Sequence, residues 1–364
     1  MTDTIRVMWV AAPYNLQKYR SITRYFPSDM SVQVVSGALA FNGKIPLLGK
    51  MRGDRHWFMP NTALFRELRR FQPDIVFTDF PTYPGLYAKM YSYLSAKRKP
   101  LVSWLLGDFW TEYDVYVREV KLRDRWQATV SLVTWVTGIK RSDRLLTVCR
   151  WLMRRAAEVI PQTKMSVLYN GIEPDLWLVN DGRFEFDHPA VGILQNNVIK
   201  PKVMGLLRFS EVIQTMPDVN FYVAGGGPYT QLVRDAFHGL TNVRMLGTLA
   251  YPNEVRRFYR SCDVYVLASG LDCCPSSLLE ASLASVPVVA SRVGGIPELV
   301  KEGETGWTIP NASVDDWTRK IRTLLEDRGL ATRMGAHGKE HVLRNFTWRR
   351  QAQMLANVFE TLIR

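Results

Sequence analysis

The chain has 364 residues, of which 47% are hydrophobic, and it carries 47 Lys and Arg against 34 Asp and Glu. This length exceeds what one hydrophobic core usually supports, so we expect two domains. No uncharged apolar stretch reaches the roughly 18 residues of a membrane-spanning helix, and the first residues lack a signal-peptide pattern, which predicts a cytoplasmic protein. The four cysteines include an adjacent pair but no spaced CxxC pairs, which argues against a zinc site and against a disulfide framework.

The positive charge is divided unevenly along the chain. Residues 1–170 hold 26 Lys and Arg against 13 Asp and Glu, whereas residues 171–364 hold 21 of each. A basic half beside a neutral half suggests that the first domain meets something anionic, which could be a membrane surface, a phosphorylated acceptor or nucleic acid. Solubility alone is the alternative explanation.

The first half alternates between strand-like and helix-like segments. It opens with a β-type run at residues 5–11 and continues with a helix from Leu16 to Phe26. Further strands are predicted at Val32–Val35, Asp74–Thr78 and Leu101–Leu106, with helices such as Asn61–Phe71 and Leu86–Ser95 between them. Strands that alternate with helices predict a parallel sheet covered on both faces.

The second half repeats this alternation. Its predicted strands are Ala190–Leu194, Val219–Ala224, Val243–Leu246, Val264–Leu267 and Val286–Ala290. The junction is expected near Tyr169–Gly171, where the turn-forming pair Asn170 and Gly171 separates the two sets of strands. Because ligands of open parallel sheets bind beyond the carboxyl ends of the strands, the loops that follow the strands are where chemistry is expected.

The segment from Ser269 to Ser282 carries the strongest chemical signal. It follows a predicted strand, and Pro275 suits the first turn of a helix that contains Glu280. The free N–H groups at the start of such a helix favour sugar hydroxyls or phosphate oxygens. Asp272 and Glu280 could each accept hydrogen bonds from a ligand. The alternative is a capping acid followed by an exposed helical glutamate.

Several motifs in the second half together resemble one enzyme family. The pattern Asp272-x7-Glu280 is followed by Ala284–Ser291, Val293–Val300 and Gly303–Gly306, and it is preceded by Asn170–Glu173, Ala224–Pro228 and Val243–Gly247. This block resembles the donor site of the family 4 retaining glycosyltransferases of the GT-B fold. The resemblance covers about residues 140–364. Residues 1–140 match only in pattern.

The resemblance implies an α/β fold of the GT-B type, with two Rossmann-like doubly wound domains that face each other across a cleft. Residues 1–170 would bind the acceptor, residues 171–345 would bind the nucleotide-sugar donor, and a C-terminal helix in residues 346–364 would cross back to the first domain. The implied reaction transfers a sugar from a UDP- or GDP-sugar to a lipid-linked or glycan acceptor with retention of configuration. No metal or other cofactor is expected.

The resemblance also assigns roles to individual residues. Asp272 would lie beside the transferred sugar, Glu280 would hold the donor ribose, and Lys202 would neutralise the diphosphate. Asn197 stands where relatives carry an Arg, and Lys200 could substitute for that Arg only as a point charge. Further donor contacts are expected from the turn before the helix and from a strand end, at Cys273, Cys274, Pro275, Ser276 and Gly247. Asn170 and Gly171 would form the hinge between the domains.

Two features of the first domain remain open at this stage. Asp108 follows a strand and is a candidate to contact the acceptor or the sugar, although a structural turn aspartate is the alternative. The segment Arg118–Arg141 places Lys121, Arg123 and Arg125 beside Trp126 and Trp135, which could lie at a membrane interface or could be core packing.

Two other classes of function are weighed against the transferase. A catalytically silent nucleotide-sugar-binding homologue would fit the missing Arg and the shorter first acid. A nucleic-acid-binding protein would fit the charge, but the sequence contains no recognisable nucleic-acid-binding motif, so nucleic acid is not an expected partner.

Overall fold

A computed structural model describes residues 4–12, 15–37, 63–79, 83–95, 97–119, 125–158, 160–161 and 164–363. The chain forms two compact units. Unit 1 consists of Met1–Tyr169 together with Trp348–Arg364, and unit 2 consists of Asn170–Thr347. Within the described ranges, no helix combines the length and the apolar character needed to cross a bilayer.

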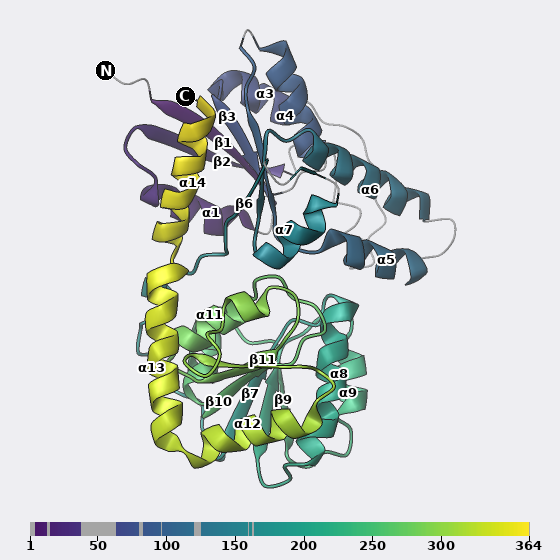
Figure 1. Cartoon of the computed structure of the whole chain (residues 1–364), viewed down its shortest axis with the longest axis vertical. Helices are drawn as coiled ribbons and strands as arrows, with labels where there is room; N and C mark the ends of the chain where they lie inside the picture. Colours follow the sequence, from purple (N-terminus) through teal and green to yellow (C-terminus); the bar gives the residue numbers. More distant parts are fainter. Residues whose placement is uncertain are drawn as a thin grey trace. The chain divides into compact units, whose positions relative to one another are not determined.

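Unit 1 is built on one parallel six-stranded sheet (Figure 1). Its strands are β1 (Ile5–Ala11), β2 (Met30–Ser36), β3 (Ile75–Thr78), β4 (Leu101–Leu105), β5 (Arg144–Thr147) and β6 (Met165–Val167). They lie in the order β2-β1-β3-β4-β5-β6. The central strands are apolar runs buried on both faces, as a parallel sheet with helices on both sides requires.

The helices of unit 1 connect these strands. They are α1 (Leu16–Ile22), α3 (Ala63–Phe71), α4 (Tyr83–Leu94), α5 (Phe109–Glu119), α6 (Arg125–Lys140) and α7 (Arg150–Ala157). The predicted helix Leu16–Phe26 is too long, because the α-helix ends at Ile22, continues as a 3-10 turn over Thr23–Tyr25, and reaches extended backbone at Phe26.

The last helix of the chain, α14 (Trp348–Ile363), belongs to unit 1. Trp348 lies edge-on to Trp104 and Tyr19, with ring centroids 6.2 and 6.0 Å apart, and Phe359 lies edge-on to Phe77 at 5.6 Å. Aromatic pairs at these separations are favourable. The return of the C-terminal helix to the first unit therefore has a packing cause in the aromatic side chains of α14.

Helix α6 carries the segment that could have formed a membrane interface. Trp135 is buried and stacks on Phe109 at 4.5 Å, so this tryptophan is core packing. The apolar residues of α6 are spread around the helix rather than along one face. Lys121 and Arg123 lie outside the described residues, and so do the side chains of Arg125 and Trp126.

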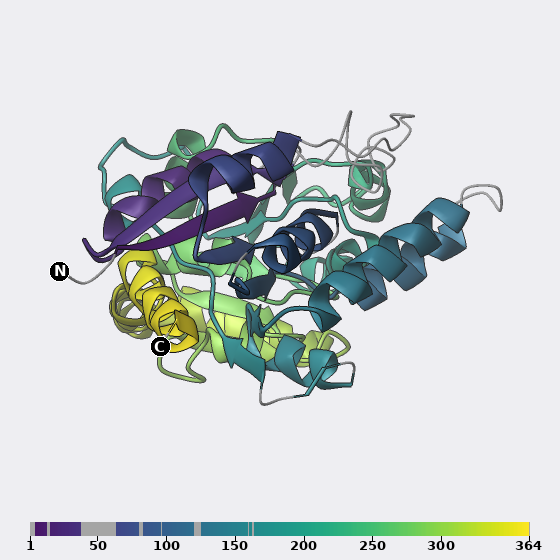
Figure 2. The same cartoon turned by 90° about the horizontal axis from the view of Figure 1, so that it is seen from above.

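Unit 2 has a second parallel six-stranded sheet, in the order β12-β11-β10-β7-β8-β9. Its strands are β7 (Ala190–Leu194), β8 (Asn220–Ala224), β9 (Val243–Gly247), β10 (Val264–Leu267), β11 (Val288–Ser291) and β12 (Gly306–Ile309). The helices are α8 (Lys200–Gln214), α9 (Thr230–Ala236), α10 (Asn253–Arg260), α11 (Ser276–Leu283), α12 (Val314–Glu326) and α13 (Arg328–Asn345). Figure 2 shows the same elements from above.

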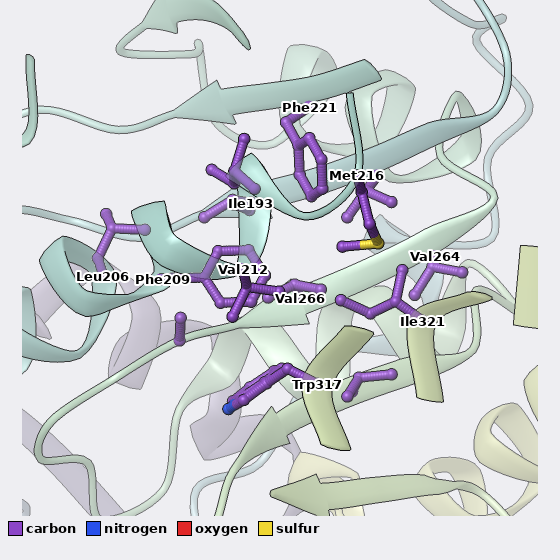
Figure 3. Close-up of a cluster of buried hydrophobic side chains, with 14 of the residues drawn as sticks. Ile193, Leu206, Phe209, Val212, Met216, Phe221, Val264, Val266, Trp317 and Ile321 are labelled. Carbon is purple, nitrogen blue, oxygen red and sulfur yellow. The ribbon is translucent and has the colours of Figure 1, made fainter. Parts of the chain in front are cut away.

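The core of unit 2 lies between this sheet and the helices α8, α9 and α12 (Figure 3). Phe209 of α8 lies edge-on to Trp317 of α12 with ring centroids 5.2 Å apart, and both side chains are buried. Val191 and Ile193 of β7 point into this cluster. Gly192, between them, faces Phe258 and Cys262 at the end of α10, so helices cover both faces of the sheet.

Each sheet has one place where the direction of strand succession reverses. In unit 1 the chain runs from β1 to β2 and then crosses to β3 on the other side of β1. In unit 2 it runs from β7 through β8 to β9 and then crosses to β10 on the other side of β7. Ligands of doubly wound sheets bind in the crevice at such switch points, beyond the carboxyl ends of the strands.

Candidate active site

At the switch point of unit 2, the backbone of α8 directly contacts the loop that follows β10. The N–H of Gly270 donates to the carbonyl oxygen of Lys202 at 3.0 Å. A Cβ on Gly270 would lie 2.2 Å from the carbonyl oxygen of Pro201, and one on Gly205 would lie 2.3 Å from the carbonyl carbon of Ser269. These glycines let the helix and the loop approach closely enough to bring Lys202 and Asp272 together.

Lys202 and Asp272 form an ion pair at this switch point. The Nζ of Lys202 lies 2.6 Å from Oδ2 of Asp272, and the two side chains are 16% and 13% exposed. The sequence resemblance gave these residues separate roles, one toward the diphosphate and one toward the sugar. The structure places them in contact. An anion that binds the Lys202 ammonium group therefore either shares it with the Asp272 carboxylate or displaces that carboxylate from it.

Glu280 lies on α11, one turn beyond its start. The helix begins at Ser276, and Pro275 is its N-cap residue in extended conformation rather than part of the first turn. Glu280 is only 6% exposed, and its Oε2 accepts a hydrogen bond from the hydroxyl of Tyr259 at 3.1 Å. The alternative of an exposed helical glutamate is therefore wrong. A buried carboxylate needs such partners, because burial without them is costly.

Two buried tyrosines surround this carboxylate. Burial raises the pKa of Tyr259, with further contributions from Tyr265 and from the charge of Glu280. Burial also raises the pKa of Tyr265, whose hydroxyl donates to the carbonyl oxygen of Leu194, the last residue of β7, at 2.8 Å. Both phenols therefore remain protonated donors at neutral pH, and Tyr259 fixes Glu280. Sequence reasoning missed this tyrosine pair, since only contacts within the fold bring Tyr259 of α10 and Tyr265 of β10 near Glu280 of α11.

The glycine loop after β8 packs against the loop after β7. Gly225 has φ +129°, and a Cβ there would lie 1.9 Å from the carbonyl oxygen of Gln195, so close backbone packing requires glycine. Asn197 is buried, its N–H donates to Gly226 at 2.9 Å, and its Nδ2 lies 3.4 Å from Thr230 Oγ1. Asn197 thus hydrogen-bonds to the glycine loop and to the helix after it, although it occupies the sequence position of the family Arg.

Two buried acceptors next to this loop are left open. Oε1 of Gln195 and Oδ1 of Asn197 have no hydrogen-bond partner among the described residues. Buried polar atoms normally are hydrogen-bonded, and those that are not often mark a ligand position. Hydroxyl or amide donors of a bound sugar nucleotide are groups that could satisfy them.

Of the other predicted donor residues, Cys274 and Gly247 accept hydrogen bonds through their backbone carbonyl oxygens. Cys273 and Cys274 are buried, and the carbonyl oxygen of Cys274 accepts a hydrogen bond from Nδ2 of Asn170 at 3.0 Å. Gly247 has φ +73° and accepts the N–H of Gly225 at 2.7 Å. Ser276 is exposed at the first turn of α11. Among the residues described, no group of three or more His, Cys, Asp or Glu side chains could hold a metal ion.

Asp108 of unit 1 is used as a helix cap. It is buried at the carboxyl end of β4, and it accepts hydrogen bonds from the N–H of Thr111 at 3.3 Å and from the Thr111 hydroxyl at 2.6 Å. Arg155 Nε lies 4.0 Å from its Oδ2. These contacts are those of an N-capping aspartate at the start of α5, which favours the structural alternative for this residue.

Asp79 is a second buried acid of unit 1 that the sequence did not single out. It lies at the switch point between β1 and β3, where it accepts hydrogen bonds from the N–H of Ala12 at 2.9 Å and from Nδ2 of Asn15 at 3.1 Å. Burial outweighs these hydrogen bonds and raises the pKa of Asp79 to about 6. Its local sequence carries no motif that would have revealed this.

A cavity of about 800 Å³ lies at the amino edge of the unit 2 sheet, away from this site. Among its charged residues, Arg322 pairs with Asp218 at 2.7 Å, and His188 lies 2.6 Å from Asp263. The chemistry expected of a sugar-nucleotide site is found at the carboxyl edge instead, so the carboxyl edge is the candidate active site.

Comparison with known proteins agrees with this geometry. A family model described as Glycosyl transferases group 1 matches residues 202–341, and one described as Glycosyltransferase Family 4 matches residues 27–176. Among solved structures, a glycosyltransferase from Rickettsia africae has a TM-score of 0.72 at 13% identity and covers 100% of both chains. Anabaena HepE in complex with UDP and glucose has a TM-score of 0.71 at 14% identity and covers 98% of this chain and 99% of its own.

The fold is therefore that of the GT-B glycosyltransferases. The chain belongs to the group 1, family 4 glycosyltransferases. Curated relatives match over part of their length. An uncharacterized glycosyltransferase of Methanocaldococcus jannaschii is 26% identical over 61% of this chain and 60% of its own. A GDP-mannose-dependent alpha-(1-6)-phosphatidylinositol monomannoside mannosyltransferase of Mycolicibacterium smegmatis is 32% identical over 60% of this chain and 62% of its own.

Proposed function

We propose that the protein transfers a sugar from a UDP- or GDP-sugar, with the donor bound at the β7–β10 switch point of unit 2 and with retention of configuration. The observation that carries the proposal is the Lys202–Asp272 ion pair at that switch point, followed along the chain by α11 with the Tyr259-bound Glu280. The names of two relatives supply the donor class: HepE binds UDP and glucose, and the M. smegmatis mannosyltransferase depends on GDP-mannose.

The leaving diphosphate gains negative charge as the glycosidic bond breaks. Lys202, Lys200 and the amino end of the 15-residue helix α8 offer positive charge for it. In the proposed front-face displacement, the bond between the sugar carbon and the donor phosphate oxygen breaks while the acceptor oxygen bonds to the same carbon. The acceptor proton passes to the departing phosphate oxygen. This scheme needs neither a covalent intermediate nor a metal ion.

Glu280 is proposed to bind the hydroxyl groups of the donor ribose. The Tyr259 hydroxyl donates to its Oε2, and this hydrogen bond orients the carboxylate that we propose binds the diol. Asp272 is proposed to lie beside the transferred sugar. Its contact with Lys202 would couple sugar binding to diphosphate binding, because one cation serves both groups.

The acceptor is proposed to be lipid-linked, with a soluble glycan or small molecule as the alternative. The charge excess of residues 1–170 favours an anionic partner, and the M. smegmatis relative is named for a phosphatidylinositol monomannoside. We propose accordingly that the protein works in the cytoplasm at the inner face of the cell membrane.

A donor screen by thermal shift tests the proposal. UDP-, GDP- and ADP-sugars are added in the presence of EDTA, because a ligand of the folded state raises the melting temperature. We expect one nucleotide series to raise it without metal. If no nucleotide sugar raises the melting temperature, the donor site is wrongly assigned, and a shift that appears only with added Mg²⁺ would contradict metal independence.

A silent nucleotide-sugar-binding homologue is the second candidate. It is favoured by one observation, the burial of Asn197 at the position of the family Arg. The two candidates give the same thermal shift, but only the transferase releases nucleoside diphosphate from the donor.

A further inference from the structure

The exposed face of α4 is more apolar than a water-facing helix requires. Met90, Tyr93 and Leu94 are spaced to share one side of the helix, and they are 44%, 73% and 70% exposed. Tyr93 and Leu94 are the most exposed large hydrophobic residues that the structure describes. Single exposed apolar residues are common, but a contiguous set indicates an interaction surface.

A cationic pocket adjoins this face. It has a volume of about 420 Å³ and is lined by Arg6, Arg69, Gln72, Tyr91, Leu94, Ser95, Lys97 and Lys99. Leu94 belongs both to the pocket and to the exposed face, so the two features are continuous.

The charges of the pocket are only partly neutralised. Asp74 pairs with Lys99 at 3.1 Å and with Arg6 at 3.6 Å. Arg69 and Lys97 have no acidic partner among the described residues. The pocket therefore keeps a net positive charge that an anion such as a phosphate group could neutralise.

The same edge of the unit 1 sheet gathers further cations. This edge comprises the amino ends of the strands, the segments that precede them and the ends of α3, α6 and α7. It carries Arg6, Arg69, Arg70, Lys97, Arg98, Lys99, Lys140, Arg141, Arg144 and Lys164, against Asp29, Asp74, Asp143 and Glu158. The opposite, carboxyl edge holds the buried acids Asp79 and Asp108. Much of the charge excess of the first half of the sequence is thus placed at one end of unit 1.

We infer that this surface, formed by Met90, Tyr93 and Leu94 with the pocket of Arg69 and Lys97, docks the protein on a bilayer that contains anionic phospholipid. Tyr93 and Leu94 enter the headgroup region, and the pocket takes a lipid phosphate. The combination of apolar side chains and cations favours a bilayer over nucleic acid, because a polyanion in water would gain little from Leu94. The inference deepens the proposed membrane association and is independent of the transfer chemistry.

Docking through α4 also bears on the acceptor. The helix has 12 residues, so its amino end lies about 18 Å from its carboxyl end. Its amino end follows β3 and lies at the carboxyl edge of the sheet, where substrates are expected. An acceptor group on a docked enzyme would therefore have to extend from the bilayer by about this distance, as a headgroup that already carries sugars or phosphates would.

Vesicle sedimentation of the full chain tests the inference. Vesicles of phosphatidylcholine with and without phosphatidylglycerol are compared at low and high salt, for the double variants Tyr93→Ser/Leu94→Ser and Arg69→Ser/Lys97→Ser. We expect binding only to the anionic vesicles, weakening with salt. Loss of two charges should weaken it on the order of 30-fold, since each contributes about 1 kcal/mol near the surface. The apolar variant should bind less at high salt as well.

Matched variants on unit 2 serve as controls. Leu178→Ser/Val179→Ser removes exposed apolar side chains, and Arg208→Ser/Arg234→Ser removes two exposed charges. Both should bind vesicles like the unchanged protein. The donor-induced thermal shift, measured on every variant, reports the proposed donor site separately from docking.

Four outcomes would overturn the inference. The first is that the protein does not bind anionic vesicles, and the second is that the Tyr93/Leu94 and Arg69/Lys97 variants bind like the controls. The third is loss of binding on changing Lys121, Arg123 and Arg125 to Ser while the Tyr93/Leu94 and Arg69/Lys97 variants bind normally, which would place docking at that segment. Retention of an oligonucleotide without retention of vesicles would identify a different anionic partner.

Discussion

Lys202 and Asp272 were each predicted from a motif, but neither motif indicates that the two side chains form an ion pair. Their spacing in the sequence is 70 residues, and only the backbone contact between α8 and the β10–α11 loop joins them. The identity of both residues could be predicted from the resemblance. Their ion pair could not, because it depends on Gly205 and Gly270 permitting a close approach.

Replacing Lys202 should affect the reaction rate more than donor binding. In Lys202→Ala the charge on the leaving diphosphate loses its cation, and that charge is larger in the transition state than in the bound donor. We expect the maximal rate to fall about 100-fold or more, the usual scale for losing such a contact, with a smaller rise in donor KM. Steady-state kinetics measure both. An unchanged maximal rate with only a raised KM would show that Lys202 binds the ground state alone.

Tyr259 should matter through Glu280. In Tyr259→Phe the carboxylate loses a hydrogen bond worth about 1 kcal/mol, so donor KM should rise about 5-fold while kcat changes little. Tyr222→Phe is a matched control, since its hydroxyl serves Asp187 rather than the site. Equal donor KM values for the two variants would contradict the positioning role of Tyr259.

At the scale of elements, the strand-helix alternation predicted from apolar runs agrees closely with the structure in both units. Buried parallel strands read as short apolar runs, which is why β1, β7 and β10 begin and end at the predicted residues. The strands β5, β6 and β12 were not predicted. They have three or four residues each, and polar or charged residues lie at or next to their first positions. Such short runs show no periodic pattern that separates a strand from a loop in the sequence.

The contact between α8 and the β10–α11 loop can be tested at its glycine. In Gly205→Ala the new Cβ would meet the backbone of Ser269, so the helix must shift and donor affinity should fall at least 10-fold, with a lower melting temperature. Gly338→Ala is the matched control within a helix, because a Cβ there makes only ordinary contacts at 3.5 Å or more. It should gain up to about 1 kcal/mol of stability. If both substitutions behave alike, the close approach does not constrain the site.

At the scale of the whole molecule, the chain divides into two units that should respond separately to core substitutions. Phe359→Ala in α14 and Phe209→Ala in α8 each remove a buried ring and should cost about 3–5 kcal/mol. Calorimetry with and without donor measures the transition of each unit. We expect donor to protect the transition lowered by Phe209→Ala and to leave the one lowered by Phe359→Ala unshifted. If the donor protects only the transition that Phe359→Ala lowers, the donor binds unit 1 instead.

The central claim is that the β7–β10 switch point of unit 2 binds a nucleotide-sugar donor for transfer. Glu280→Ala tests it most directly, because the carboxylate that Tyr259 holds is the group proposed to bind the ribose hydroxyls. The measurement is release of nucleoside diphosphate from the donor that raises the melting temperature of the unchanged protein. The unchanged protein should release it, and a folded Glu280→Ala variant should release none that is detectable. Full activity in that folded variant would contradict the account.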